Sequence, residues 1–185
     1  MKIDITLRVT SFFCSLLISS ALSGGISCAH VGADDMPDSV AEVEYQIYLE
    51  FKPNDLVVLN KLGMVYYRLN KLPAALEEFS KVLKRDPDNY DALAGMGLVM
   101  AAQHNYDEAI RYHQQAIAHN PKDMMTYYHL GRALEKKGVF EDAAKAYQTA
   151  LEKFNEQYPT TSNNQNAAEF AGKVREALSQ IENKL

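Results

Sequence analysis

Residues 59–87 read LNKLGMVYYRLNKLPAALEEFSKVLKRDP, and the pattern of this stretch returns twice further along the chain. Its glycine, Gly63, is followed by Gly97 and Gly131 at steps of 34 residues. Small residues at a fixed helical position let two helices approach each other closely. A constant period of this length indicates a stack of helical hairpins, in which each unit buries its apolar face against the next.

Other positions keep the same 34-residue step, so the glycines are not an isolated coincidence. A column of alanines follows the glycines, and a large and then a small column follow at helical spacing. These columns are Ala75, Ala109 and Ala143; Phe79, His113 and Tyr147; and Val82, Ala116 and Ala150. Pro87 and Pro121 mark the ends of the first two units, because the residue before a proline leaves the helical region. The sequence therefore predicts three hairpin units.

The first unit resembles the signature of the tetratricopeptide repeat family at eight positions. They are Leu59, Leu62, Gly63, Tyr66, Ala75, Phe79, Val82 and Pro87. The later units depart from the signature, with Met100 and Leu134 for tyrosine, His113 for phenylalanine and Asn155 for proline. Each departure still supplies a bulky group or a helix end. The resemblance implies an all-α fold, a right-handed α-solenoid of helix-turn-helix repeats with a C-terminal capping helix.

The period also predicts how the chain is divided. Ala41, Tyr45 and Leu49 stand 34 residues before Ala75, Phe79 and Leu83, which indicates a single helix of a partial repeat ahead of the three units. Near the C-terminus, apolar residues recur at helical steps and predict the capping helix. The expected segments are 1–29, a signal peptide or N-terminal anchor; 30–37, a flexible acidic linker; 38–55, the partial repeat; 56–89, 90–123 and 124–157, the three repeats; and 158–185, a loop and the capping helix.

The N-terminal segment has the layout of a secretory signal peptide, with basic residues, an apolar run from Val9 to about Leu22, and small residues after it. Cleavage after Ala29 or Ala33 fits this layout, and an uncleaved anchor is the alternative. The stretch around Cys28, residues 25–28, resembles a bacterial lipobox, although Gly25 stands where leucine is usual. We therefore expect an exported protein, periplasmic or membrane-associated, with Cys28 as the candidate lipidation site of an outer-membrane lipoprotein or as an ordinary cysteine near the cleavage site.

Charge and composition argue against several functional classes. A net charge of −5 and the lack of a basic cluster argue against nucleic-acid binding. Both cysteines precede the repeats, and no phosphate loop, nucleophile elbow or metal-binding histidine spacing appears. His113 stands in an aromatic core column, so it is expected to be a packed side chain. We expect no cofactor, no metal site and no independent enzyme activity.

The resemblance assigns a partner-binding groove to the first helix of each repeat. The candidate residues are Asn60, Met64, Tyr67, Asp91, Leu98, Tyr128 and Arg132. Family members that bind carboxylate tails of chaperones use a Lys/Asn/Lys/Arg clamp, and only Arg132 carries a matching residue type, so this ligand class is disfavoured. A mostly apolar groove with aromatic edges is typical of binding to an amphipathic helix or an extended apolar segment. The alternative is a groove covered by the N-terminal segment or by a second copy of the chain.

The function predicted from these features is a non-catalytic adaptor or scaffold. It binds a protein or peptide in the concave groove and aids assembly of a cell-envelope complex. The alternatives are a self-associating homo-oligomeric scaffold, in which the helix of the partial repeat packs on a neighbour, and a regulatory subunit of an enzyme.

Overall fold

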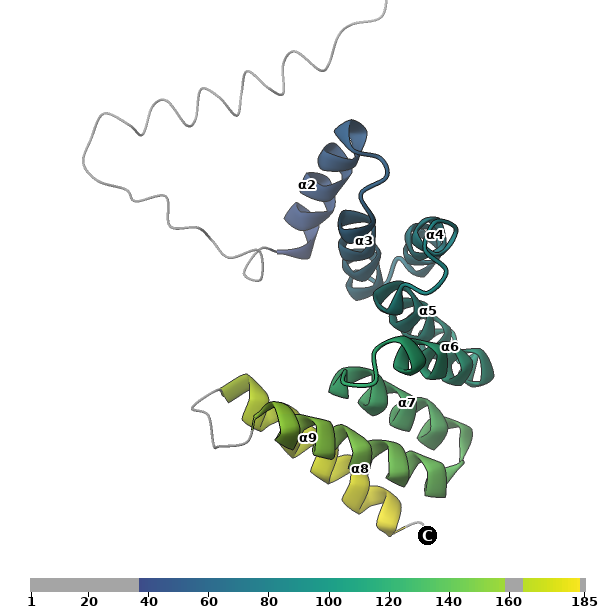
Figure 1. Cartoon of the computed structure of the whole chain (residues 1–185), viewed down its shortest axis with the longest axis vertical. Coiled ribbons are helices and arrows are strands. Elements are labelled where there is room, and N and C mark those ends of the chain that lie inside the picture. Colours follow the sequence, from purple (N-terminus) through teal and green to yellow (C-terminus); the bar gives the residue numbers. More distant parts are fainter. Residues whose placement is uncertain (1–36, 159–164, 184–185) are drawn as a thin grey trace, which may run out of the picture. The chain divides into compact units, whose positions relative to one another are not determined.

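The structure, a computed structural model, describes residues 37–158 and 165–183, and Figure 1 shows how their helices follow one another. The segment from 37 onward forms a compact unit of its own. The predicted signal peptide or anchor, the linker up to residue 36, Cys28 and the loop at 159–164 lie outside the described residues. The helices are α2 (Asp38–Phe51), α3 (Leu56–Arg68), α4 (Leu72–Leu83), α5 (Tyr90–Ala102), α6 (Tyr106–His119), α7 (Met124–Lys137), α8 (Phe140–Gln157) and α9 (Gln165–Glu182).

The expected all-α solenoid is confirmed, since the described ranges hold helices and no strand. The strongest packing joins α3 to α4, α5 to α6 and α7 to α8, which are the three hairpins. Consecutive hairpins join through α4 with α5 and α6 with α7, while α2 packs on α3 and α9 on α8. Every major contact is between near neighbours in sequence, as in a repeat protein.

The first helix of each repeat begins at a side-chain cap that follows the 34-residue step. Asp55, Asn89 and Asp123 precede α3, α5 and α7, and their side chains accept hydrogen bonds from backbone N–H groups of the first turn. Such caps satisfy donors that have no partner within the helix. The caps therefore fix where the first helix of each repeat starts, independently of the apolar pattern.

The turn inside each hairpin also repeats, and it needs a left-handed residue. Asn70, His104 and Gly138 hold this position with φ of 58°, 64° and 87°. The next residue donates its N–H to a carbonyl five residues back at 2.8–2.9 Å in all three turns, which closes the end of the first helix. Only the third turn uses glycine, the residue for which this conformation is free of strain.

The glycine column lets a ring lie against the backbone of the first helix. A methyl group built on Gly63 would stand 2.7 Å from Cε1 of Phe79, and one on Gly131 would stand 2.7 Å from Cδ1 of Tyr147. Phe79 and Tyr147 are both fully buried. The closest contact between the two helices of each hairpin is thus made by the glycine of the first helix and the ring of the second. The alanines at the positions of Ala75, Ala109 and Ala143 are also buried.

The same rings also contact the following repeat. A methyl group on Gly95, in α5, would also overlap the ring of Phe79, at 2.3 Å from Cζ, so this ring contacts both Gly63 and Gly95. The residue 34 positions after Gly95 is His129, and its ring stacks on His113 with centroids 6.0 Å apart. Phe79 and His113 therefore each join two successive repeats as well as the two helices of their own repeat, whereas Tyr147 lies in the last repeat.

The last repeat is covered by α9. Val174 and Ile181 of this helix are fully buried in one cluster with Tyr147 and Ala150. Phe170 packs edge-on against Tyr128 of α7, with centroids 5.7 Å apart. The capping role expected for this helix follows from these contacts, because a terminal repeat would otherwise expose its apolar face.

Two glycine-to-alanine changes test this packing and are predicted to have opposite signs. Gly95→Ala should lower the free energy of unfolding by about 1–2 kcal/mol, because overpacking a fixed ring costs more than the gain in helix propensity. Gly172→Ala on α9 has open space around its new methyl group, so it should raise stability by up to about 1 kcal/mol. Denaturant unfolding measures both changes, and a stabilised Gly95→Ala variant would contradict the packing described.

Candidate functional site

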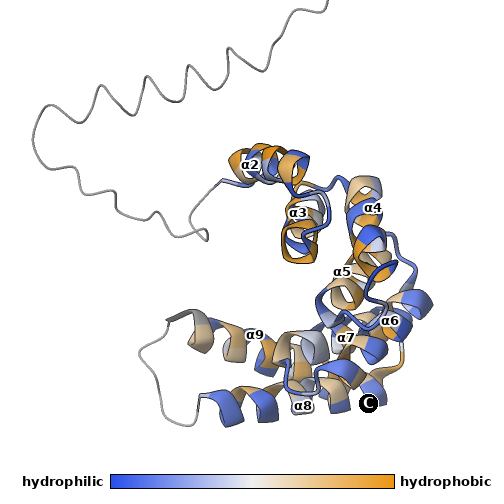
Figure 2. Ribbon diagram, turned by 45° about the horizontal axis from the view of Figure 1, so that its top comes forward, coloured by the Kyte–Doolittle hydropathy of each residue, from blue (hydrophilic) through white to orange (hydrophobic). Residues whose placement is uncertain are grey.

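The first helices of the repeats form a continuous layer. Helix α3 packs on α5, and α5 packs on α7, whereas the second helices α4, α6 and α8 do not pack on one another to a comparable extent. Helices that pack closely in series lie on the inner side of a curved stack, which is the arrangement visible in Figure 2. We call the seven residues predicted on this layer, Asn60, Met64, Tyr67, Asp91, Leu98, Tyr128 and Arg132, the groove face.

In the first repeat, two of the three groove-face residues are apolar and half-buried. Met64 and Tyr67 pack at the margin of the first core cluster and keep part of their surface open. Asn60 donates from Nδ2 to Oδ1 of Asn89 at 2.9 Å, so it contacts the residue that caps α5. Asn60 thus links two inner helices, while Met64 and Tyr67 offer apolar contact surface.

In the second and third repeats, the groove-face residues differ in how much of their side-chain surface is open to a partner. Leu98 is half-buried and belongs to none of the described core clusters. Tyr128 packs against Phe170 and lies 5.8 Å from Tyr147 between ring centroids, so it helps to seat α9. The guanidinium of Arg132 lies 5.9 Å from the centroid of Tyr128 and is exposed. Leu98 and Arg132 are therefore available to a partner, whereas the ring of Tyr128 mostly packs against the capping helix α9.

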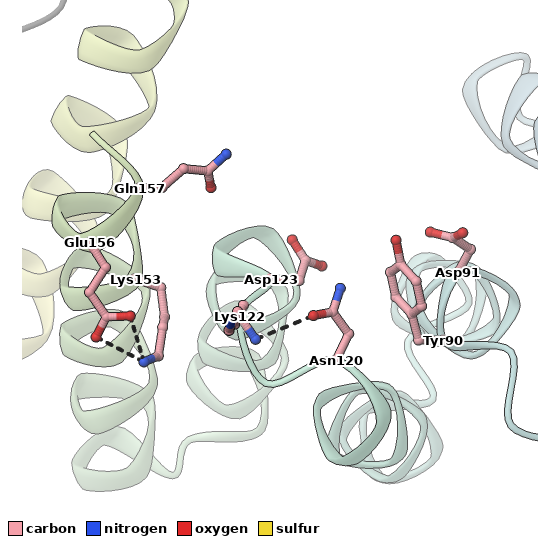
Figure 3. A pocket seen from close by; sticks show the side chains of 8 residues that line it. All are labelled: Tyr90, Asp91, Asn120, Lys122, Asp123, Lys153, Glu156 and Gln157. Carbon is pink, nitrogen blue, oxygen red and sulfur yellow. Dashed lines mark hydrogen bonds and ion pairs between the residues drawn. The ribbon is translucent and has the colours of Figure 1, made fainter. Parts of the chain in front are cut away.

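A polar cleft of about 660 Å³ lies beside the groove face, and Asp91 belongs to both. Figure 3 shows it between the start of α5, the α6–α7 turn and the end of α8. The lining residues are Tyr90, Asp91, Asn120, Lys122, Asp123, Lys153, Glu156 and Gln157. Only Asp91 was predicted from the sequence. The others were missed because the cleft brings together a helix start, a turn and a helix end from different repeats.

The charges in the cleft are mostly engaged with one another. Burial raises the pKa of Asp91, an effect that a hydrogen bond from Tyr90 opposes and the charge of Asp123 reinforces. Asp123 caps α7, and Lys153 lies 3.0 Å from Glu156 between Nζ and Oε1. This arrangement offers hydrogen-bonding groups to a polar segment of a partner, and it does not assemble a nucleophile with a general base.

A second titratable pair, buried His113 and half-buried His129, lies where α6 packs on α7. His113 is 1% exposed, stacks on His129 and has no hydrogen-bond partner for either ring nitrogen in the described part of the chain. Burial, then the neighbouring His129, lowers the pKa of His113 to about 3. Burial and Arg132 lower the pKa of His129 to about 4, against the effect of Asp123. The expectation that His113 is a packed side chain is confirmed.

Two further observations limit the chemistry of the described residues. Within 37–158 and 165–183, no group of three histidine, cysteine, aspartate or glutamate side chains is placed to hold a metal ion. The helices in these ranges are also too short or too polar to cross a bilayer.

A family model for the tetratricopeptide repeat matches residues 60–112 and 96–159, which together make up more than half of the chain. The chain belongs to the tetratricopeptide repeat family. Proteins of this family are typically non-catalytic adaptors in protein interactions.

Two relatives match this chain over a small part of their own length. Probable UDP-N-acetylglucosamine–peptide N-acetylglucosaminyltransferase SPINDLY of Hordeum vulgare is 33% identical over 81 residues, which is 44% of this chain and 9% of that protein. Cellulose synthase 1 operon protein C of Komagataeibacter xylinus is 34% identical over 87 residues, 46% of this chain and 7% of that protein. The chain spans about a tenth or less of the length of these relatives.

Solved structures with a similar fold come from bacteria and from human. The type III secretion chaperone SycD of Yersinia enterocolitica, solved with a peptide of the translocator YopD, has a TM-score of 0.59 at 22% identity, covering 68% of this chain and 91% of SycD. The first tetratricopeptide domain of human RPAP3 has a TM-score of 0.55 at 25% identity, covering 72% of this chain and 99% of that domain. These similarities support the solenoid fold.

The histidine pair predicts a loss of stability on acidification. Both histidines stay neutral in the folded state down to about pH 4, whereas in the unfolded chain they take up protons below about pH 6.5. The unfolded state therefore binds more protons in this window, and the free energy of unfolding falls as pH falls through it, by up to about 1.4 kcal/mol per pH unit for each histidine. Unfolding curves between pH 7 and pH 4.5 measure this slope.

The test variant is His113→Phe, which restores the residue of the family signature. This change should remove about half of the histidine-dependent slope. An unaltered slope in His113→Phe would show that this side chain is not the buried neutral group described.

Proposed function

We propose that this chain is a non-catalytic adaptor that binds a protein or peptide segment along the groove face. The observation that carries the proposal is that Met64, Tyr67 and Leu98 keep apolar surface open on the layer of inner helices. Apolar side chains on a concave, preformed layer favour an apolar or amphipathic segment, which gains affinity from a few anchored residues.

Two charged residues of the groove face suggest the polar features of the partner. Arg132 is exposed beside Tyr128, and Asp91 borders the polar cleft. A segment that lies across α5 would place its apolar residues over Leu98 and its polar groups toward Asp91 and Arg132. We therefore propose a ligand with a central apolar stretch and charged groups on its borders, bound without chemical change.

We also propose that the protein is exported and helps to assemble a complex of the cell envelope. The basic, apolar and small-residue segments that precede the repeats support this part of the proposal. Cys28 remains the candidate lipidation site. The intact mass of the mature N-terminus, purified from the native host, distinguishes cleavage, lipidation and retention of the segment.

A pair of site-specific crosslinkers tests binding on the groove face. A photo-reactive residue at Leu98 should capture a protein in the native host, and the same residue at Gln115, which is exposed on α6, should not capture it. Leu98→Glu should then weaken binding of the captured protein at least tenfold, because the carboxylate would be buried without a partner. Gln115→Glu is the control. Unchanged affinity in a folded Leu98→Glu variant would contradict binding on this face.

A further inference from the structure

Helix α2 is apolar on two opposite faces, and only one of them is packed. Ala41 is buried, and Tyr45 and Leu49 pack against the first core cluster. On the other side, Val40, Val43, Ile47 and Phe51 are 51%, 53%, 44% and 80% exposed. At 3.6 residues per turn these four side chains fall within an arc of about 80°. We call them the α2 stripe.

Polar contacts fix the orientation of α2, so the α2 stripe cannot turn inward. Asp38 accepts from Nε of Arg68 at 2.9 Å, Glu42 accepts from Nζ of Lys71 at 2.7 Å, and Gln46 donates to the hydroxyl of Tyr66 at 2.7 Å. All three contacts join the packed side of α2 to the first repeat. The opposite side therefore stays outward in the folded chain.

The repeat register shows that the apolar character of this face is special to α2. The residues 34, 68 and 102 positions after Val43, Ile47 and Phe51 occupy the matching register in the second helices of the three repeats, with Arg85 just past the end of α4. They are Glu77, Lys81 and Arg85; Arg111, Gln115 and His119; and Lys145, Thr149 and Lys153. All nine are polar, and of the counterparts of Val40, which are Ala74, Glu108 and Asp142, only Ala74 is apolar. Figure 2 shows more blue on α6 and α8 than on α2. The α2 stripe is thus not a feature that the repeat itself requires.

A helix that is apolar on opposite sides is ordinarily buried on both. The charges around the α2 stripe indicate what could cover it. Glu44 and Glu50 are exposed and lie on its two borders, and Lys52 at the end of α2 places its ammonium 5.3 Å from the ring centroid of Tyr48. A second copy of α2 would bring acidic borders against acidic borders, whereas a helix with basic borders would pair with them.

We propose that the α2 stripe is a second docking surface, which binds an amphipathic helix of a partner protein with an apolar seam and lysine or arginine on both borders. The surface is distinct in its residues from the groove face, so an adaptor that uses both can hold two segments at once. A helix of 14 residues is about 21 Å long, and contact along it alone is smaller than a standard stable interface. The interaction is therefore weak and reversible by itself.

Synthetic peptides test this surface on the full chain. The probe is a fluorescent, helix-stapled peptide of about four turns, with leucine along one face and lysine on both borders of that face. The control peptide is identical except that glutamate replaces each lysine. We expect the lysine peptide to bind at least fivefold more tightly than the glutamate peptide in low salt, measured by fluorescence anisotropy.

Two sets of substitutions separate the apolar and charged contributions. The triple variant Val43→Gln, Ile47→Gln and Phe51→Gln keeps the charge and uses the residue found in this register at Gln115, and it should weaken binding of the lysine peptide at least tenfold. The double variant Glu44→Gln and Glu50→Gln should remove the preference for lysine over glutamate. Because all five positions are exposed, the thermal midpoint should stay within a few degrees.

Three outcomes would overturn the proposal. The first is that neither peptide binds the full chain, and the second is that a folded triple variant binds the lysine peptide as well as the unaltered chain does. The third is a concentration-dependent dimer, seen by sedimentation, that the triple variant abolishes, since this would assign the α2 stripe to a second copy of the chain. Loss of groove-face binding in Leu98→Glu does not alter any of these results, so the two proposals fail independently.

Discussion

The contact between a buried ring and the backbone of a glycine is the constraint on which the stack depends. Phe79 contacts both Gly63 and Gly95, and it thereby holds both helices of its own repeat and the first helix of the next. His113 and Tyr147 occupy the same column in the later repeats and contact Gly97 and Gly131. Because Phe79 and His113 each contact two repeats, they limit how closely the first helices of successive repeats, which carry the groove face, can lie.

Much of this arrangement follows from the sequence because the same physical requirement recurs every 34 residues. Gly63, Gly97 and Gly131 predict close approach, and the ring column predicts what approaches them. Gly95 could not be recognised in this way, since its counterparts are Lys61 and His129 and it belongs to no column. The caps at Asp55, Asn89 and Asp123 do follow the period and were visible in principle as a column of short polar side chains.

The candidate site was less predictable than the fold, because periodicity assigns a position to a side chain but not its neighbours. Tyr128 has the same register as a groove residue, yet its ring packs on Phe170 of a helix outside the repeats. The cleft at Asp91 depends on Lys153 and Glu156, which lie near the end of a second helix. The α2 stripe appears only when α2 is compared in register with α4, α6 and α8 and its packed side is known from the structure.

A double-mutant cycle on Phe79 and Gly95 tests the central claim most directly, by measuring the free energy of unfolding of Phe79→Leu, Gly95→Ala and the two combined. If the ring is clamped between repeats, the smaller leucine makes room for the new methyl group, and the combined variant is less destabilised than the sum of the single changes by at least about 1 kcal/mol. Additivity within about 0.5 kcal/mol would contradict the claim, because it would show that the ring and Gly95 do not constrain each other.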